Sequence, residues 1–261
     1  MGSSESTGGT QSIERAVSVL RVLASANQSG GMSFMDVCQA TGLTKGTTYR
    51  ILRVLKKEGF VAQHGTTRLY HLGMDFLALG PLTTNRLNLR DVAKPFLERL
   101  AHETEDTLFL SVPSGMESIC VDRCEGSFPI KALTLNIGDR RPLGVGAGAL
   151  ALLAWQPDPE VKDIIGRNAR RLRKSGVLRE DLLTDWVRRT RENGYAFNDG
   201  QFLGGMCAIG VPVLDRSKRP IAALSIAAIS ERMSSPRREV LVGLLGSSAD
   251  QLSQALLARG G

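Results

Sequence analysis

The chain has 261 residues, 42% of them hydrophobic, and its 33 Lys and Arg against 26 Asp and Glu give a formal net charge of +7. This length allows one large domain or two ordinary ones, and the basic balance favours a polyanionic partner without identifying it. No apolar run reaches the roughly 18 residues of a membrane span, and the opening MGSSESTGG lacks the apolar stretch of a signal peptide. We therefore predict no membrane partner.

The spacing of the cysteines and histidines bears on metal sites. Cys38, Cys120, Cys124 and Cys207 form no Cys-x-x-Cys pair, and only three histidines are scattered elsewhere. Zinc ligands come at close spacings, so we predict no metal and no cofactor. Unpaired cysteines fit a reducing compartment, and the predicted location is the cytoplasm.

The first elements are two short helices. Residues 1–11 are predicted to be a disordered tail, and apolar residues at helical spacing then indicate a helix over about residues 12–26. Ser33, followed three residues later by Asp36, has the pattern of a capping box and begins a second helix. Gly42 ends that helix after about two turns.

A third helix and a hairpin follow. Thr44 has the character of an N-cap, and the helix that it begins ends at Gly59. The sequence FVAQHGTTRLYHLG holds two short alternating runs around a Gly-Thr-Thr turn, which predicts a two-stranded hairpin. Three short helices and a hairpin within residues 12–73 indicate a winged helix-turn-helix.

The third helix is predicted to have two different faces. At about 100° per residue, an aliphatic stripe of Ile51, Leu52 and Leu55 with Thr48 falls on one side. The opposite side holds Gly46, Arg50, Arg53 and Lys57. A cationic face of this kind is either merely solvated or binds DNA. The hairpin favours DNA, because it carries Gln63, His64 and Arg68 at or beside its tip, where a wing meets the duplex.

Residues 74–88 are predicted to be an interdomain linker helix. Its apolar stretch MDFLALG should stop at Gly80-Pro81, because proline interrupts helical hydrogen bonding. Another helix begins near Leu89, and it tolerates Pro95 only in its first turn or at a kink.

From Thr107 onward the pattern changes to strands and helices around one sheet. Three strands are predicted at TLFLSVPS, ESICVDRC and KALTLNIG, and a Gly-rich turn then leads into the apolar helix of RPLGVGAGALALLAW. Two amphipathic helices follow, the second ended by Gly194, and then two long apolar strands form a hairpin around Asp215–Lys218. With a closing amphipathic helix, residues 89–261 are predicted to be an α+β domain with a mostly antiparallel sheet.

In order along the chain, these elements resemble the IclR family of transcriptional regulators. The resemblance covers about residues 12–258, and its motifs are SIERAVSVLRVL, TGLTKGTTYRILRVLKKEGFV, YHLG, RRPL, GMCAIGVPVLD and AALSI. It implies a winged helix that binds operator DNA as a homodimer or tetramer, and a C-terminal domain of GAF-like fold that binds a small effector. Arg15 and Ser33 are DNA-binding candidates by this resemblance. The predicted DNA-binding residues are Arg15, Ser33, Thr44, Lys45, Gly46, Thr47, Arg50, Arg53, Lys57 and Arg68.

The chain departs from the family where the effector should bind. The turn after Pro-Leu usually carries a histidine and a lysine, and here it reads GVGAGAL. Asn198 stands where an acid is frequent, Ala208 where a cysteine is frequent, and Ala227 where a second serine accompanies Ser225. These changes make room beside Ser225 and remove negative charge, so we expect a small organic acid and favour an aromatic one. The predicted effector-binding residues are Ile130, Leu133, Arg141, Ala147, Gly148, Asn198, Met206, Ala208, Ser225 and Ala227.

Several motifs admit more than one interpretation. The GVGAGA turn either packs closely against the sheet or offers backbone N–H groups to a carboxylate, and it lacks the spacing of a nucleotide-binding fingerprint. Asp122-Arg123 is expected to form an ion pair or a dimer contact. Cys120 and Cys124 should share one strand face as buried apolar residues, with redox sensing as the alternative.

The function predicted from the sequence is that of a ligand-responsive, DNA-binding transcriptional regulator and not an enzyme. Ser225 has no histidine base nearby in any motif, so no catalytic residue is predicted. The alternative is a small-molecule-binding or enzymatic C-terminal domain, with the winged helix as a protein-interaction module.

Overall fold

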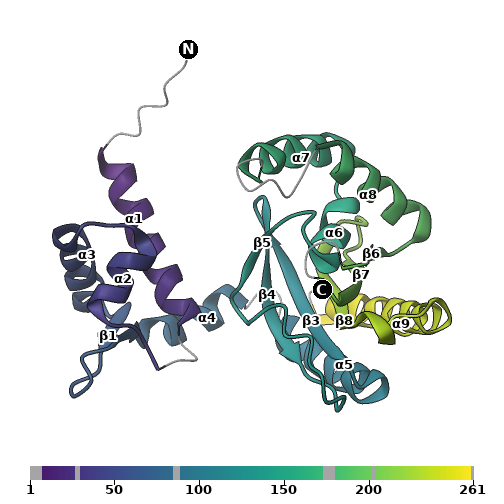
Figure 1. Ribbon diagram of the computed structural model, residues 1–261, viewed down its shortest axis with the longest axis horizontal. Coiled ribbons are helices and arrows are strands. Elements are labelled where there is room, and N and C mark those ends of the chain that lie inside the picture. The colour runs from purple at the N-terminus through teal and green to yellow at the C-terminus, as the bar shows by residue number, and fades with distance from the viewer. Residues whose placement is uncertain (1–7, 27–29, 85–88, 173–179, 201–203, 260–261) are drawn as a thin grey trace. The chain divides into compact units, whose positions relative to one another are not determined.

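The computed structural model describes residues 8–26, 30–84, 89–172, 180–200 and 204–259 (Figure 1). The chain divides into two compact units, Met1–Arg86 and Leu87–Gly261. The predicted fold class is confirmed, because a helical unit with a small hairpin is followed by a unit of helices around an antiparallel sheet.

The N-terminal unit is a three-helix bundle with a wing. Its elements are α1 (Gly8–Ser25), α2 (Phe34–Thr41), α3 (Lys45–Lys57), the antiparallel strands β1 (Val61–Gln63) and β2 (Tyr70–Leu72), and α4 (Asp75–Thr84). Val19 and Leu23 of α1 meet Val37, Leu52 and Val61 in one buried cluster. The aliphatic stripes predicted on the helices therefore form the core of this unit.

The predicted caps set the boundaries of α2 and α3. The Ser33 hydroxyl accepts from the Asp36 N–H at 3.2 Å, and the Asp36 carboxylate accepts from the Ser33 N–H at 3.3 Å, a complete capping box. Gly42 takes the left-handed conformation with φ 67° and ends α2. The Thr44 hydroxyl accepts from the Thr47 N–H at 3.4 Å and begins α3.

Two boundaries differ from the prediction. Helix α1 begins at Gly8, inside the predicted tail 1–11, whose residues 1–7 lie outside the described part of the chain. Helix α4 continues through Gly80-Pro81 to Thr84. A proline removes one backbone hydrogen bond and bends a helix without having to end it. Residues 85–88 of the predicted linker helix are likewise outside the described residues, whereas Pro95 lies within the helix that follows.

The C-terminal unit is a six-stranded antiparallel sheet with helices on both faces (Figure 1). In the order of the sheet its strands are β5 (Arg140–Pro142), β4 (Glu117–Cys124), β3 (Thr107–Ser114), β8 (Pro220–Ile229), β7 (Met206–Leu214) and β6 (Ala196–Asn198). The helices of this unit are α5 (Leu89–Thr104), α6 (Ala147–Ala154), α7 (Asp158–Leu172), α8 (Glu180–Asn193), the short η3 (Ser230–Arg232) and α9 (Ser235–Arg259).

Each face of the sheet has its own core. Helices α5 and α9 pack against one face, where Leu108 and Leu110 of β3 point, while α6, α7 and α8 form a cluster with Ala223 of β8 on the other. Phe109 and Ser111 alternate with the two leucines along β3, so they point to the α6 side. The face toward α6 is the one that encloses a cavity lined by residues of β3, β7 and β8.

The predicted strand KALTLNIG is not a strand. Residues 131–139, called here the covering segment, run irregularly over the α6 face of the sheet and lead into β5. Cys120 holds its end through two backbone hydrogen bonds, from its N–H to the Asp139 carbonyl and from the Gly138 N–H to its own carbonyl. The Arg123 guanidinium donates to the Leu135 carbonyl at 3.1 Å. These hydrogen bonds hold the covering segment in place of the regular hydrogen-bond ladder of a strand. Its alternation of apolar residues nevertheless resembles that of a strand.

A β-bulge separates Cys120 from Cys124. Leu110 pairs with Asp122 but Ser111 pairs with Cys120, so one extra residue stands in β4. Cys120 consequently packs on the cavity side and Cys124 on the opposite side, against the α5 and α9 core. The prediction that both cysteines share a face is wrong, because an extra residue reverses the alternation. Burial raises the pKa of the Cys120 thiol to about 11.

The Asp122-Arg123 pair is divided between two partners. Asp122 pairs with Arg90 at 3.3 Å, and Arg123 pairs with Glu125 at 2.9 Å. Neighbouring strand residues point to opposite faces, so the two side chains cannot form an ion pair with each other as readily as with these partners.

Candidate functional site

Helix α3 presents the predicted basic face to solvent. Thr48 and Leu52 are buried, with 0% and 2% exposure, whereas Gly46, Arg50 and Arg53 are exposed on the other side. Within the part of the chain that the structure describes, neither Arg50 nor Arg53 forms an ion pair. Lys57 has an exposed neighbour, Glu58, at 3.7 Å. The face is therefore a surface of largely uncompensated positive charge.

The residues before and at the start of α3 have local partners. The Thr44 hydroxyl donates to the Thr47 hydroxyl at 3.0 Å, and Lys45 is exposed. The Ser33 hydroxyl donates to the Asp36 carboxylate at 2.7 Å, so it belongs to the cap of α2. Arg15 of α1 is half-buried and lines a groove of about 370 Å³ between α1 and α3, together with Thr47 and Arg50.

The wing is joined to α3 by side-chain hydrogen bonds. The Lys56 ammonium donates to the Gln63 amide oxygen at 3.4 Å, and the Gln63 amide donates to the Arg68 carbonyl at 3.0 Å. Arg68 is exposed and has φ 60°, in the left-handed region. The tip thus projects an exposed arginine beside the basic helix.

Tyr49 also lies on the exposed side of α3, and the sequence prediction missed it. Its side chain is 56% exposed. Tyr49 follows Gly46 by three residues and precedes Arg53 by four, so the three lie side by side on the helix surface. The sequence prediction selected small and cationic residues on this face and therefore omitted an aromatic one.

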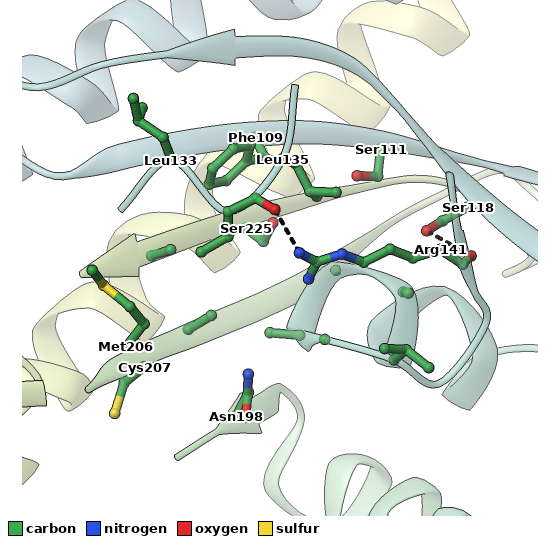
Figure 2. A pocket seen from close by; sticks show the side chains of 18 residues that line it. Phe109, Ser111, Ser118, Leu133, Leu135, Arg141, Asn198, Met206, Cys207 and Ser225 are labelled. Carbon is green, nitrogen blue, oxygen red and sulfur yellow. Dashed lines mark hydrogen bonds between the residues drawn. The ribbon is translucent and has the colours of Figure 1, made fainter. Parts of the chain in front are cut away.

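The C-terminal unit contains a cavity of about 470 Å³ between the sheet, the covering segment and the start of α6 (Figure 2). Every predicted effector-binding residue lines it except Ile130. These residues are Leu133, Arg141, Ala147, Gly148, Asn198, Met206, Ala208, Ser225 and Ala227. Residues from five separate parts of the chain are brought together here.

Ile130 does not reach the cavity, and its side chain is 55% exposed. It precedes the covering segment, where the backbone turns irregularly rather than alternating as a strand, so Leu133, Thr134 and Leu135 provide the contacts instead. Sequence reasoning also missed Phe109, Ser111 and Ser118. The alternation in TLFLSVPS could have found the first two, since it places them on one face. The remaining lining residues are Val145, Gly146, Ala149 and Cys207.

One end of the cavity is basic and polar. Figure 2 shows the Arg141 side chain extending into the cavity, between Ser225 and Ser118. Its guanidinium donates to the Thr134 carbonyl at 2.5 Å, and the nearby Asp139 carboxylate accepts from the Asn136 N–H. Among the described residues, no carboxylate forms an ion pair with Arg141. Burial lowers the pKa of its guanidinium.

The N-terminus of α6 lies at the same end. Its N-cap is Gly146, with φ 83° and no side-chain cap, so the N–H groups of the first turn have no partner within the helix. A Cβ at Gly146 would stand 3.0 Å from the Arg141 guanidinium. The guanidinium therefore lies directly against the positive end of the helix dipole.

Close packing also shapes this turn. A Cβ at Gly148 would stand 3.0 Å from the Ser225 hydroxyl, and one at Gly210 would stand 2.4 Å from the Ala147 carbonyl oxygen. The glycines at positions 148 and 210 thus allow α6 to pack closely onto β7 and β8.

The other end of the cavity is apolar. Phe109 is 2% exposed and forms a buried cluster with Ala227, against which Met206 and Ala208 pack. Asn198 pairs with Ala208 across β6 and β7, and its amide oxygen accepts from the Gly200 N–H at 3.3 Å.

A hydrolytic site requires a base beside its nucleophile, and a metal site requires a cluster of ligands. No histidine is among its lining residues, so Ser225 has no imidazole base there. Across the described ranges no group of three His, Cys, Asp or Glu residues is placed to hold a metal ion. Among those same residues, no helix is long and apolar enough to cross a membrane.

Two family models match the chain in the two units just described. The IclR helix-turn-helix domain matches residues 12–65, and the bacterial transcriptional regulator IclR C-terminal domain matches residues 82–254. The chain belongs to the IclR family. As in other IclR regulators, the helix-turn-helix is the DNA-binding domain and the C-terminal domain binds the effector.

Relatives agree over nearly the whole length. The transcriptional regulator XynR of Escherichia coli (strain K12) is 28% identical over 249 residues, which cover 95% of each chain. The crystal structure of an IclR regulator from Alicyclobacillus acidocaldarius has a TM-score of 0.75 at 23% identity, covering 96% of this chain and 99% of that one. An IclR homolog from Microbacterium hydrocarbonoxydans, complexed with 4-hydroxybenzoate, has a TM-score of 0.75 at 22% identity, covering 95% and 99%.

Proposed function

We propose that this IclR regulator responds to an aromatic carboxylic acid bound in the 470 Å³ cavity, with the carboxylate at Arg141 and the aromatic ring toward Phe109. The observation that carries the proposal is the Arg141 guanidinium, which extends into the cavity and donates to a neutral carbonyl, Thr134. Among the described residues it forms no ion pair with a carboxylate. The regulator acts by binding, in the cytoplasm, and without catalysis.

Electrostatics favour an anion at this place. The Arg141 guanidinium and the positive end of the α6 dipole adjoin each other in a half-buried site. The repulsion between these like charges raises the free energy of the empty site. An incoming carboxylate relieves that repulsion and accepts hydrogen bonds from Arg141 and from the Ala147 and Gly148 N–H groups. Asn198, as a neutral residue, adds no repulsion toward the anion.

The apolar end favours a ring. Phe109 offers an aromatic surface, and the small side chains of Ala208 and Ala227 leave room beside Ser225. A two-carbon acid would leave that surface uncovered, whereas an aryl group buries it and gains from ring contacts. The cavity volume lies within the usual range for small-molecule sites. The related protein complexed with 4-hydroxybenzoate supports this class of ligand for the fold.

The test compares benzoate and 4-hydroxybenzoate with benzamide, which has the same ring and no charge, by calorimetry and thermal unfolding of the full chain. Both acids should bind and raise the melting temperature, because they bind only the folded state, and benzamide should not. Arg141→Gln should weaken acid binding by about 10- to 100-fold, the value of a charged hydrogen bond.

Arg140→Gln is the matched control, because Arg140 neighbours Arg141 on β5 but pairs with Glu117 at 2.7 Å and does not line the cavity. It should bind the acids as the unmodified chain does. Equal binding of benzoate and benzamide, or an Arg141→Gln variant with unchanged affinity, would refute the proposed carboxylate site.

On the DNA side, we propose that the operator is contacted by the predicted residues of α3, by the N-cap residues Ser33 and Thr44, by Arg68 of the wing and by Arg15. Support comes from the exposed arginines of α3, which form no ion pair within the described ranges, and from the wing attached beside them. A dimer or tetramer of this chain would present two such helices to paired half-sites, which supplies the specificity that a single winged helix lacks.

A further inference from the structure

Tyr49 is an aromatic residue that the folding of the N-terminal unit does not use. It is the fifth residue of α3 and is 56% exposed, whereas the adjacent Thr48 is fully buried at 0%. The buried cluster of this unit is complete with the aliphatic side of α3 and does not include Tyr49. The ring is therefore available to a partner that approaches the exposed side of the helix.

The surroundings of Tyr49 identify the kind of partner. On the helix surface its neighbours are Gly46 three residues before, Lys45 four before and Arg53 four after, and α3 contains no acidic residue. Gly46 leaves open space, since a Cβ there would meet no atom within 4 Å. An apolar protein surface would have to desolvate the flanking cations to reach this ring. DNA offers phosphates to the cations and base edges to the ring.

We propose that Tyr49 reads a thymine, by packing its ring against the C5-methyl group in the major groove. Residues in the N-terminal half of a recognition helix are the ones that reach base edges, and apolar side chains select thymine through its methyl group. The Gly46 notch lets the helix approach the bases closely enough for the ring to make that contact. This inference rests on the DNA-binding role of α3 and adds a sequence-specific contact to it.

The experiment begins with the full-length chain and a pool of random duplexes, from which the preferred sequence is selected. Tyr49→Ala should lose the preference for thymine at one base pair of each half-site, with about a 10-fold loss of affinity for the preferred duplex. Tyr49→Phe should keep the preference, because the ring remains. Lys57→Ala is the control: it should weaken all duplexes evenly and reduce the salt dependence, as loss of a phosphate contact does.

A second measurement can be made on the unmodified chain alone. Replacing that thymine by deoxyuridine removes only the methyl group, so it should weaken binding of the unmodified chain. The same replacement should leave binding of a folded Tyr49→Ala variant unchanged. The proposal is overturned if Tyr49→Ala retains the preference, if deoxyuridine has no effect, or if the unmodified chain selects no sequence. It is also overturned if Tyr49→Ala changes the oligomeric state, which would place the ring at a subunit contact. If the unmodified chain binds no DNA, the DNA-binding role of α3 fails as well. If it binds its operator and one of these outcomes is still observed, only the proposed role of Tyr49 fails.

Discussion

Arg50 and Arg53 lie on the same exposed side of α3 and approach any duplex that the helix enters. The double variant Arg50→Ala, Arg53→Ala should bind the operator on the order of 100-fold more weakly, because it removes a base contact or phosphate contact at each position. Electrophoretic mobility shift at fixed salt measures this, with circular dichroism to confirm folding. Arg167→Ala is the control, since Arg167 is in the other unit and pairs with Asp163. A folded double variant with unchanged operator affinity would remove α3 from the interface.

Ala227 lies at the apolar end of the cavity, where its small side chain leaves room for a ligand. It is 3% exposed and pairs with Ala208 across β7 and β8. Ala227→Trp should fill the cavity and abolish effector binding, measured by calorimetry, while operator binding stays intact. Ala227→Leu intrudes less and guards against misfolding by overpacking. Normal binding of the effector by both variants would locate the ligand elsewhere.

At the scale of elements, short helices depend on their caps. Helix α2 has only eight residues, and the Ser33 hydroxyl bonds both to the Asp36 N–H and to its carboxylate. Ser33→Ala should lower the free energy of unfolding by about 1 kcal/mol, measured by urea denaturation of the N-terminal transition. Ser33→Asp should recover most of that loss, because Asp is also a good N-cap. Unchanged stability in Ser33→Ala would show that the cap is dispensable and would leave Ser33 as a DNA contact alone.

The covering segment contacts both ends of the cavity. Its Thr134 carbonyl accepts from Arg141 at the basic end, and its Leu135 carbonyl accepts from Arg123. The same stretch of backbone also covers the apolar end. A ligand that binds Arg141 therefore adjoins the segment directly. Its leucines, Leu133 and Leu135, line the cavity from above the sheet.

At the scale of the whole molecule, we propose that the chain self-associates through exposed apolar side chains on α1, on α4 and just before α4. Ile13 is 67% exposed, Met74 73% and Leu77 67%, whereas Phe76 packs edge-on against Phe60 at 5.3 Å. Leu77→Glu should shift the protein toward monomer in sedimentation at micromolar concentration, because a charge in an apolar contact is costly. It should also weaken operator binding, since a monomer reaches only one half-site.

Val240→Glu is the control for this prediction, because Val240 is comparably exposed at 61% but lies on α9 of the other unit. It should leave both assembly and operator binding unchanged. A Leu77→Glu variant that stays a dimer would exclude this side of α4 from the contact, and an unmodified chain that sediments as a monomer with and without DNA would exclude self-association.

Local chemistry was enough to predict most elements from the sequence. The capping box at Ser33, the left-handed Gly42 and the apolar stripe of α3 each depend on residues a few positions apart, so their pattern is visible in the chain itself. The same holds for the β7 and β8 hairpin and for the family motifs. The cationic face of α3 followed from helical spacing, and most of the cavity lining followed from the resemblance to the family.

What depended on contacts between distant segments could not be predicted in this way. The bulge in β4 places Cys120 and Cys124 on opposite faces, and only the pairing of β4 with β3 reveals the extra residue. Residues 131–139 alternate like a strand, yet tertiary anchors at Cys120 and Arg123 hold them as an irregular cover, which leaves Ile130 outside the cavity. The direction of the Arg141 side chain depends on distant segments in the same way. Its guanidinium extends into the cavity, where it donates to the Thr134 carbonyl and adjoins the glycine at position 146.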